Sequence, residues 1–282
     1  MFDTAIIGTG PAGLSAAINL KLHDKSVVWF GSAQFSDKVE KSEKIANYPG
    51  MGYIGGKELN AHFAAHAQTL GLTVEDRMVT NIMPMDRHFM LLAENEVYEA
   101  KTVLLATGVV SARSFDGEAE FLGRGVSYCA TCDGFLHRGK TIAVFCAAQR
   151  YEHEVTYLAG LAAKVYLYTP YKDCAVDAPN VEKIPPIRAV TGDQRVGSIT
   201  LFDGTQMAVD ALFCLRNAVA PTTLLPALAV EGAHIVTDRT QRTNIPGCFA
   251  AGDCTGRPYQ LAKAVGEGNV AAHSILDYLA EK

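Results

Sequence analysis

Two of the seven cysteines, Cys129 and Cys132, lie two residues apart in the segment CATCDG, and Asp133 directly follows the second. A pair at this spacing opens and closes an intramolecular disulfide readily, and a helix N-terminus or a nearby charge can lower the pKa of one thiol. The aspartate could move protons as thiolates form and are released, although Asp at such a place also commonly caps a helix. The segment therefore predicts a redox dithiol, with Cys129, Cys132 and Asp133 as its catalytic residues.

A metal site or a structural disulfide is the alternative use of such a pair. A zinc site needs a second ligand pair at metal spacing. The remaining cysteines instead stand singly along the chain: Cys146, Cys174, Cys214, Cys248 and Cys254. An odd cysteine count with one close pair is also untypical of a secreted disulfide framework. We therefore predict no metal site and expect the five single cysteines to be small core residues.

A glycine-rich turn stands near the N-terminus, between a predicted strand at 2–7 and a predicted helix. Gly8 permits the tight turn, Gly10 lets a pyrophosphate approach the backbone, and Gly13 lets the helix pack closely on the strand. The helix N-terminus then offers free N–H groups to the phosphates. The predicted loop consists of Gly8, Thr9, Gly10, Pro11, Ala12 and Gly13. The next strand, VVWFGS, lacks the acidic residue that often holds a ribose, so this loop alone leaves NAD and FAD both open.

A second cofactor signal is the segment CFAAGDCTG, in which a strand of small residues ends at Gly252 and Asp253. Such a turn can place a carboxylate against the ribityl chain of a cofactor, although taken alone it is equally an ordinary acidic turn. The ATG segment at 106–108 ends another buried strand in the same way. Together with the first loop, these turns indicate one dinucleotide site.

The elements that must position these residues form two similar units. The first has predicted strands at 2–7, 25–31, 72–76 and 101–108, with a meander of short strands at 78–99. The second has a strand at 140–145, a helix at 152–162 and a strand at 164–169, and a long helix at 259–279 closes the chain. The predicted fold is α/β, with two three-layer Rossmann-like nucleotide-binding domains, the second inserted into the first. The predicted boundaries give 1–111 and 241–282 for the first domain and 112–240 for the central redox domain.

The bulk composition excludes several classes of protein. The 282 residues are 49% hydrophobic and 20% charged, with a formal net charge of −5. This is typical of a globular protein, and it favours neither nucleic acid nor a membrane as a partner. The N-terminal MFDTAIIGTG is expected to be a strand rather than a signal peptide, and no apolar run reaches the roughly 18 residues of a membrane span. We expect a cytoplasmic location.

The order and spacing of five blocks resemble the low-molecular-weight thioredoxin reductase family of flavoproteins. The resemblance covers nearly the whole chain. The blocks are GTGPAGLSAA near the start, NYPG at 47–50, LLATG at 104–108, GRGVSYCATCDG at 123–134 and IPGCFAAGD at 245–253. One departure is the segment SDKVEKSEKIANYPG, which lacks the glycine-glycine-glutamine that many members carry there.

The resemblance implies FAD as the cofactor and a homodimer as the assembly. It implies that Cys132 faces the flavin and that Cys129 attacks the disulfide of the protein substrate, thioredoxin. Besides the glycine loop, it implies that FAD is held by Ser32, Asn47, Val79, Ala106, Thr107, Gly108, Gly252, Asp253, Gln260, Leu261 and Ala262.

The second unit lacks the glycines that an NADPH site needs. After the strand at 140–145 the chain reads Cys-Ala-Ala-Gln-Arg over 146–150, and these β-carbons would occupy the space of the pyrophosphate. After the strand at 164–169, arginines should grip a 2′-phosphate, but Pro170, Tyr171 and Lys172 stand there. We predict that this domain has a degenerate NADPH-type fold. The pattern resembles the ferredoxin-dependent flavin thioredoxin reductases.

Ferredoxin as electron donor is energetically permitted. A plant-type ferredoxin lies near −400 mV and thioredoxin near −270 mV, so two electrons release roughly 6 kcal/mol. The sequence therefore predicts an FAD-dependent disulfide reductase that passes electrons from reduced ferredoxin to thioredoxin. Lys38, Lys41, Lys44 and Arg138 could form a landing patch for acidic ferredoxin, or simply a solvated face.

Three alternatives stay open. The first is an NADPH-dependent thioredoxin reductase with an atypical nucleotide loop. The second is a diflavin-linked disulfide oxidoreductase, in which Tyr166, Tyr168 and Tyr171 stack a second flavin; aromatic residues are also common as packing on strands. The third is a non-enzymatic FAD-binding regulator, against which the intact CATCDG argues.

Overall fold

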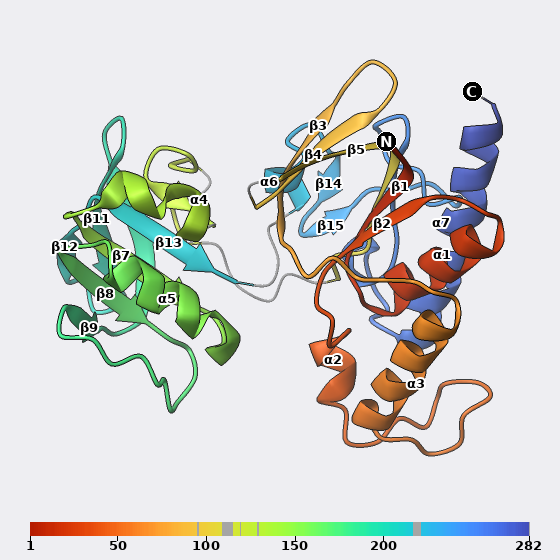
Figure 1. Ribbon diagram of the computed structural model, residues 1–282, viewed down its shortest axis with the longest axis horizontal. Coiled ribbons are helices and arrows are strands. Elements are labelled where there is room, and N and C mark those ends of the chain that lie inside the picture. The colour runs from red at the N-terminus through yellow and green to blue at the C-terminus, as the bar shows by residue number, and fades with distance from the viewer. Residues whose placement is uncertain (95, 109–114, 119, 129, 217–220, 282) are drawn as a thin grey trace. The chain divides into compact units, whose positions relative to one another are not determined.

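The structure is a computed structural model of the 282-residue chain. It describes residues 1–94, 96–108, 115–118, 120–128, 130–216 and 221–281. The chain folds into two compact units (Figure 1), of which the first comprises Met1–Val110 and Ala220–Lys282 and the second Ser111–Val219. The second unit is inserted into the first, as the sequence predicts.

The sheet of the first unit has six strands in the order β2-β1-β5-β4-β3, with β16 paired to the other side of β5. The strands are β1 (Phe2–Ile7), β2 (Val27–Phe30), β3 (Val79–Pro84), β4 (Phe89–Ala93), β5 (Glu96–Leu105) and β16 (Cys248–Ala250). The strands β1, β2, β5 and β16 run parallel, whereas β3, β4 and β5 form an antiparallel meander. Ile7 and Ala250 both pair with Leu105, so β1, β5 and β16 end at the same edge of the sheet.

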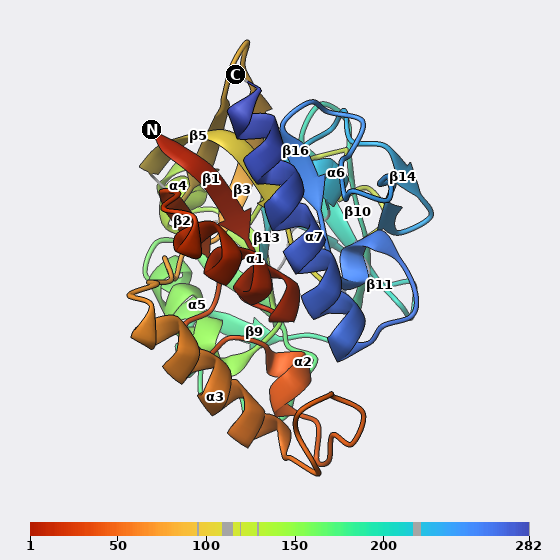
Figure 2. The ribbon, with the colours of Figure 1, turned by 90° about the vertical axis from the view of Figure 1, so that its right-hand side faces the viewer.

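Helices α1 and α7 cover one face of this sheet (Figure 2). The helices of the unit are α1 (Pro11–Leu22), α2 (Asp37–Glu40), α3 (Gly56–Thr69), α6 (Pro221–Leu224) and α7 (Leu261–Ala280), with a short 3₁₀ turn η3 (Asp253–Thr255). Leu20 and Ile275, one from each long helix, are fully buried against Ile6 and Phe249 of the strands. Gly268 of α7 allows close packing on α1, because a β-carbon there would lie 2.2 Å from the carbonyl oxygen of Ala12.

The second unit contains a parallel sheet in the order β6-β13-β7-β8-β9 and a separate antiparallel sheet, β10-β11-β12. The strands are β6 (Val126–Ser127), β7 (Thr141–Cys146), β8 (Lys164–Tyr168), β9 (Val181–Lys183), β10 (Ile187–Gly192), β11 (Val196–Leu201), β12 (Gln206–Ala208) and β13 (Ala211–Leu215). The helical segments are α4 (Ala130–Asp133), η1 (Gly134–His137), η2 (Gln149–Tyr151) and α5 (Glu152–Ala159). Val155 and Leu158 of α5 are fully buried against Val144 and Phe213 of the sheet, so this unit has its own core.

The second boundary differs from the prediction, because the second unit ends at Val219 and not at residue 240. Over its described part, 221–240, the intervening segment carries α6 and a short hairpin, β14 (Val230–Glu231) with β15 (His234–Ile235). Side chains tie this hairpin region to the first unit: Asn244 Nδ2 donates to the Ala227 carbonyl at 2.8 Å, and His234 Nε2 lies 2.7 Å from the Tyr259 hydroxyl.

Two predicted strands also differ. Residues 72–76 form no strand and make one isolated bridge, Glu75 with Phe30 of the edge strand β2, while Leu72 and Val74 pack against the core. The meander is confirmed, but its last strand and the predicted strand at 101–108 are one continuous strand, β5. Among the described residues, no helix is long and apolar enough to cross a membrane.

Candidate active site

The three predicted cofactor turns meet at one edge of the first sheet. Each follows one of the adjacent parallel strands β1, β5 and β16. A β-carbon on Gly8 would lie 2.2 Å from the carbonyl oxygen of Ala106, and one on Gly252 would lie 3.0 Å from the β-carbon of Ala12. The glycine loop, the ATG segment and the Gly252-Asp253 turn are therefore in direct contact. The crevice beyond the carboxyl ends of parallel strands is where α/β folds bind nucleotides.

The glycine loop has the geometry that a pyrophosphate requires. Gly8 has φ +119°, and Trp29 Nε1 donates a 2.9 Å hydrogen bond to its carbonyl oxygen. A β-carbon on Gly13 would lie 1.9 Å from that same oxygen, so close packing of helix on strand needs glycine there. At Gly10 a β-carbon would meet no described atom within 4 Å, which leaves its backbone open to a ligand. Because α1 begins at Pro11, its N-terminus faces this opening.

The Thr107 hydroxyl is a second sign that the site fits a polar cofactor. Its oxygen is buried and makes no hydrogen bond of normal geometry within the described residues. Gly108 beside it has φ +66°. Thr9 lies buried within the glycine loop, and Ala106 is buried at the end of β5. A buried hydroxyl without a partner is costly, and a bound group with a polar atom there would satisfy it.

The carboxylate of Asp253 forms an ion pair with Lys38 of α2, at 2.5 Å from Nζ to Oδ2. The Lys38 ammonium also lies 5.0 Å from the centre of the Tyr259 ring. At the start of α7, Asn47 Nδ2 donates a 2.9 Å hydrogen bond to Gln260 Oε1. Two predicted FAD contacts that are far apart in sequence are thus in direct contact.

The structure connects the other predicted FAD contacts less directly with the three turns. Leu261 packs against a cluster that contains Ile54, whereas Ala262 is exposed. Ser32 follows β2 and donates to Gln34 Oε1 at 2.8 Å. Val79 is buried in β3, where it pairs with Ala93. Within the described residues, no hydrogen bond links Ser32 or Val79 to the three turns.

The dithiol segment follows β6 and forms α4. Cys129 lies outside the described residues, and the side chain of Cys132 does as well. Asp133, at the end of α4, accepts a 2.6 Å hydrogen bond from the Ser127 hydroxyl. It makes no side-chain capping bond to the 3₁₀ turn that follows, so the structure does not support the alternative role as a helix cap. The Asp133 carboxylate is thus oriented by a neighbouring hydroxyl, as a proton-transfer group would need.

The five single cysteines are free thiols. Cys146, Cys214, Cys248 and Cys254 are buried, which agrees with the predicted role in the core, and Cys174 is half-buried. Burial raises the pKa of Cys248 to about 12 and that of Cys254 to about 11, and it raises the pKa of Cys214 further. These three thiols stay protonated at neutral pH and are poor nucleophiles.

The crevice of the second unit, at the ends of β7 and β8, is bridged by the chain's own side chains. Glu152, the first residue of α5, accepts a 2.8 Å hydrogen bond from the Tyr171 hydroxyl and a 3.1 Å bond from the Ala175 N–H. Gln149 Nε2 donates to the Asp173 carbonyl at 3.3 Å, and Cys146 Sγ lies 3.4 Å from the Tyr171 hydroxyl. A carboxylate therefore stands at the helix N-terminus where a pyrophosphate would bind, and the loop after β8 is attached to it.

The three tyrosines of the diflavin alternative are engaged by this chain. Tyr168 stacks on Phe145, with ring centres 5.4 Å apart. The Lys164 ammonium lies 4.7 Å from the centre of the Tyr166 ring, and Tyr171 packs against the core of the unit. These contacts favour packing over flavin stacking.

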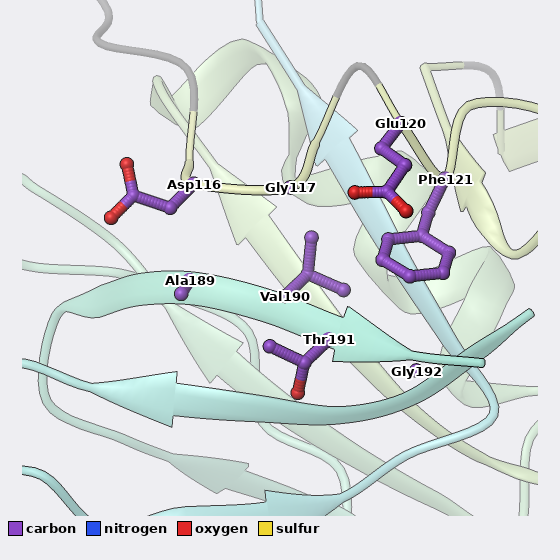
Figure 3. A pocket seen from close by; sticks show the side chains of 8 residues that line it. All are labelled: Asp116, Gly117, Glu120, Phe121, Ala189, Val190, Thr191 and Gly192. Carbon is purple, nitrogen blue, oxygen red and sulfur yellow. The ribbon is translucent and has the colours of Figure 1, made fainter.

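A hollow that none of these residues lines lies in the second unit (Figure 3). Its walls are formed by Asp116, Gly117, Glu120 and Phe121 on one side and by strand β10 on the other. Asp116 is attached to β10 by two backbone hydrogen bonds, one of which runs from the Val190 N–H to the Asp116 carbonyl at 2.8 Å. Because no predicted site residue lines this hollow, we assign it no role.

Sequence reasoning missed three groups of side chains. The sequence indicates Lys38 only as part of a docking patch. Lys263 and Glu267 of α7 bind the turn that carries Asp253. Glu118 and Arg216 form a buried ion pair in the second unit. Of these groups, only Lys263 and Glu267 have a spacing that predicts their contact, because they lie four residues apart on a predicted helix.

Comparison with known proteins agrees with this geometry. The model of the pyridine nucleotide-disulphide oxidoreductase family matches residues 2–156 and 180–268. A thioredoxin reductase of Helicobacter pylori is 32% identical, over 99% of this chain and 99% of its own length. A crystal structure of a ferredoxin-flavin thioredoxin reductase from Clostridium acetobutylicum is 40% identical, with a TM-score of 0.94 over 99% of this chain and 98% of that one. A thioredoxin reductase structure from Gloeobacter violaceus is 26% identical, with a TM-score of 0.82 over 99% and 94%.

The family match leaves out residues 157–179, which contain β8 and Tyr171. Of the residues that bridge the crevice, Gln149 and Glu152 lie inside the match and Tyr171 lies outside it. In the first unit the family match and the site geometry agree, because the glycine loop and the open backbone at Gly10 fit a dinucleotide. The chain belongs to the pyridine nucleotide-disulphide oxidoreductase family, as an FAD-binding flavoprotein related to the thioredoxin reductases.

Proposed function

We propose that this protein is a ferredoxin-dependent thioredoxin reductase. The observation that carries the proposal is the bridged crevice of the second unit, in which Tyr171 binds Glu152 at the start of α5, the helix end that receives a pyrophosphate in nucleotide-binding folds. The similarity to the ferredoxin-flavin enzyme of Clostridium acetobutylicum supports the same donor. A flavin that cannot take a hydride from NADPH needs another source of electrons. The reduction potential of ferredoxin is low enough to supply them.

In the first unit, the glycine loop is the proposed holder of the pyrophosphate, with Thr107 and Asp253 toward the rest of FAD. Gly10 exposes its backbone, Thr107 offers a buried hydroxyl without a hydrogen bond of normal geometry among the described residues, and Asp253 offers a carboxylate. When bound, FAD supplies the chemistry that joins one-electron donors to the two-electron reduction of a disulfide.

In the second unit, the proposed reaction is thiol–disulfide exchange at Cys129 and Cys132. Two electrons and two protons convert their disulfide into two thiols. The Cys129 thiolate attacks one sulfur of the thioredoxin disulfide, and a mixed disulfide forms while the other thioredoxin sulfur leaves as a thiolate. Cys132 then attacks Cys129, which restores the protein's own disulfide and releases the second thioredoxin sulfur. Asp133, oriented by Ser127, donates and accepts the protons.

Turnover with a complete electron chain tests the proposal. Purified protein, photoreduced ferredoxin and oxidised thioredoxin should yield thioredoxin thiols anaerobically. The Cys132→Ser variant should keep its flavin and lose this activity by more than a hundredfold, while Cys174→Ser should behave as wild type. Substantial thioredoxin reduction by Cys132→Ser would contradict the proposed exchange.

The homodimer and the cytoplasmic location remain predictions. Size-exclusion chromatography with light scattering decides the first, because a dimer doubles the 30.3 kDa mass of the chain.

A further inference from the structure

The turn that carries Asp253 is held by two side chains of α7, Lys263 and Glu267. Glu267 Oε2 accepts a 2.8 Å hydrogen bond from the Gly252 N–H and a 2.9 Å bond from the Thr255 hydroxyl. Lys263 Nζ donates to the Gly252 carbonyl at 2.9 Å and to the Gly256 carbonyl at 2.8 Å. Lys263 therefore contacts the glycines at both ends of the turn, and Glu267 contacts Gly252 at its beginning and Thr255 near its end.

The two side chains also bind each other. Lys263 Nζ lies 3.1 Å from Glu267 Oε2, four residues along the same helix, and donates to the Thr255 hydroxyl at 3.1 Å. Their side chains are only 18% and 20% exposed. An ion pair that is largely removed from water and shares several hydrogen bonds is worth more than an isolated surface pair.

The turn needs such support because its own backbone is permissive. It begins at Gly252, with φ +91°, and ends at Gly256, with φ +128°. Glycine populates many conformations, so two glycines around a three-residue 3₁₀ turn leave its shape weakly determined. Lys263 and Glu267 satisfy both the N–H and the carbonyl of Gly252, the residue directly before Asp253.

The support acts on the turn and not on the glycine loop. In the part of the chain that the structure describes, every hydrogen bond of these two side chains goes to residues 252–256 or to the other member of the pair. The Asp253 carboxylate pairs with Lys38, whose side chain is 64% exposed, and among the described residues no hydrogen bond joins that carboxylate to Lys263 or Glu267. Lys263 and Glu267 thus hold the chain on both sides of Asp253, at Gly252, Thr255 and Gly256.

We infer that Lys263 and Glu267 are positioning residues of the flavin site, which fix the Asp253 turn so that its carboxylate meets the flavin half of FAD. The inference rests on the proposed assignment of Asp253 to FAD. It separates two parts of the cofactor site. The glycine loop binds the ADP half, and the braced turn determines affinity for the flavin half.

Comparing the binding of FAD with that of ADP tests this separation. Full-length protein is freed of flavin and then titrated with FAD, followed by flavin fluorescence, and with ADP, followed by calorimetry. Lys263→Met keeps the length of the side chain and loses its charge and its hydrogen bonds. We expect its Kd for FAD to rise about tenfold, which corresponds to about 1.4 kcal/mol, and its Kd for ADP to stay within twofold. Lys101→Met, which removes a lysine from an ion pair with Asp3 in the same unit, is the matched control and should change neither Kd.

A second variant keeps the test decisive if Lys263→Met fails to fold. Glu267→Gln retains an acceptor oxygen for the Gly252 N–H and loses the ion pair, so its Kd for FAD should rise by about threefold. Unchanged FAD affinity in the variants that fold would overturn the inference. An equal loss of FAD and ADP affinity would also overturn it, because the pair would then support the whole unit. Neither readout involves ferredoxin or NADPH, so the result does not depend on which electron donor the protein uses.

Discussion

The Tyr171 hydroxyl donates a 2.8 Å hydrogen bond to Glu152 Oε1, and Oε2 of the same carboxylate accepts the Ala175 N–H at 3.1 Å. Glu152 begins α5, the helix whose N-terminus would receive a pyrophosphate in a nucleotide-binding domain. In this chain a carboxylate from the helix itself takes that place, and it holds the loop that follows β8. A negatively charged dinucleotide would have to displace these contacts and approach Glu152, which electrostatic repulsion opposes.

Removing the Tyr171 hydroxyl should weaken the second unit without creating a nucleotide site. Tyr171→Phe loses a hydrogen bond to a carboxylate, so the free energy of unfolding should fall by about 1.5–3 kcal/mol. NADPH should still leave the flavin oxidised, because Glu152 and the β-carbons of Ala147 and Ala148 remain. Urea denaturation and flavin absorbance measure the two effects. Tyr157→Phe is the control, since Tyr157 is exposed on α5. Reduction of the flavin by NADPH in Tyr171→Phe would show that one hydroxyl blocks an otherwise intact site.

A buried ion pair should dominate the stability of the second unit. Arg216 donates to Glu118 Oε1, and their side chains are 5% and 2% exposed. Tyr128, directly before Cys129, donates to the same oxygen at 2.6 Å, and Glu118 Oε2 accepts the Phe115 N–H at 2.8 Å. Arg216→Met leaves the Glu118 charge buried without its partner, which should cost about 3–5 kcal/mol in chemical denaturation.

The double variant Glu118→Gln/Arg216→Met separates pairing from packing. Because neither charge then remains, its loss of stability should be smaller than the sum of the two single losses. Additive losses would mean that the two side chains act independently. Arg188→Met serves as the control, because its ion pair with Asp116 is long, at 4.0 Å, and exposed.

Proton transfer by Asp133 predicts a graded loss of activity. Asp133→Asn cannot take up a proton, so thioredoxin reduction should slow by about a hundredfold or more. Ser127→Ala keeps the carboxylate and loses the 2.6 Å hydrogen bond that orients it, so a smaller loss, of about tenfold, is expected. Stopped-flow measurement of thiol–disulfide exchange checks both. Asp116→Asn, which alters an exposed acid of the same unit, should retain full activity. Wild-type exchange rates in Asp133→Asn would remove this residue from the mechanism.

Thiol labelling should separate the redox pair from the buried cysteines. In the reduced protein at pH 8, Cys129 and Cys132 should react with iodoacetamide within minutes. Because burial raises the pKa of Cys248 to about 12 and of Cys254 to about 11, their thiols stay protonated and should react more than a hundredfold more slowly. Peptide mass spectrometry over time reads each site. Unfolding in urea should equalise the rates, which controls for peptide detection. Fast labelling of Cys254 in the folded protein would contradict its placement in the core.

The parts of the fold that the sequence predicts well are those determined by local chemistry. The turn at Gly8 needs a positive φ and the contact at Gly13 admits no β-carbon, so both glycines carry their structural reason in their type. The long helix α7 is predicted by its apolar pattern. The burial of the single cysteines is predicted by their small, apolar side chains.

The parts that the sequence did not predict depend on contacts between distant segments. Glu118 and Arg216 are 98 residues apart, and Lys38 and Asp253 are 215 apart, and no periodicity links such pairs. The hairpin β14–β15 has two residues in each strand, too few for a readable pattern. The predicted domain boundary therefore lies at 240, whereas the observed one lies at 219. The spacing of Lys263 and Glu267 predicts that they meet each other, but it does not predict that both bind Gly252.

The most direct test of the proposed function is the anaerobic absorbance of the bound flavin as donors are added in turn. NADPH, then NADH, then photoreduced ferredoxin are mixed with the purified protein, and the flavin band is followed. We predict that both nicotinamide nucleotides leave the flavin oxidised over minutes and that reduced ferredoxin bleaches it. Prompt bleaching by NADPH would contradict the account, because the loop over 146–150 and the Glu152–Tyr171 contact would then not prevent nucleotide binding.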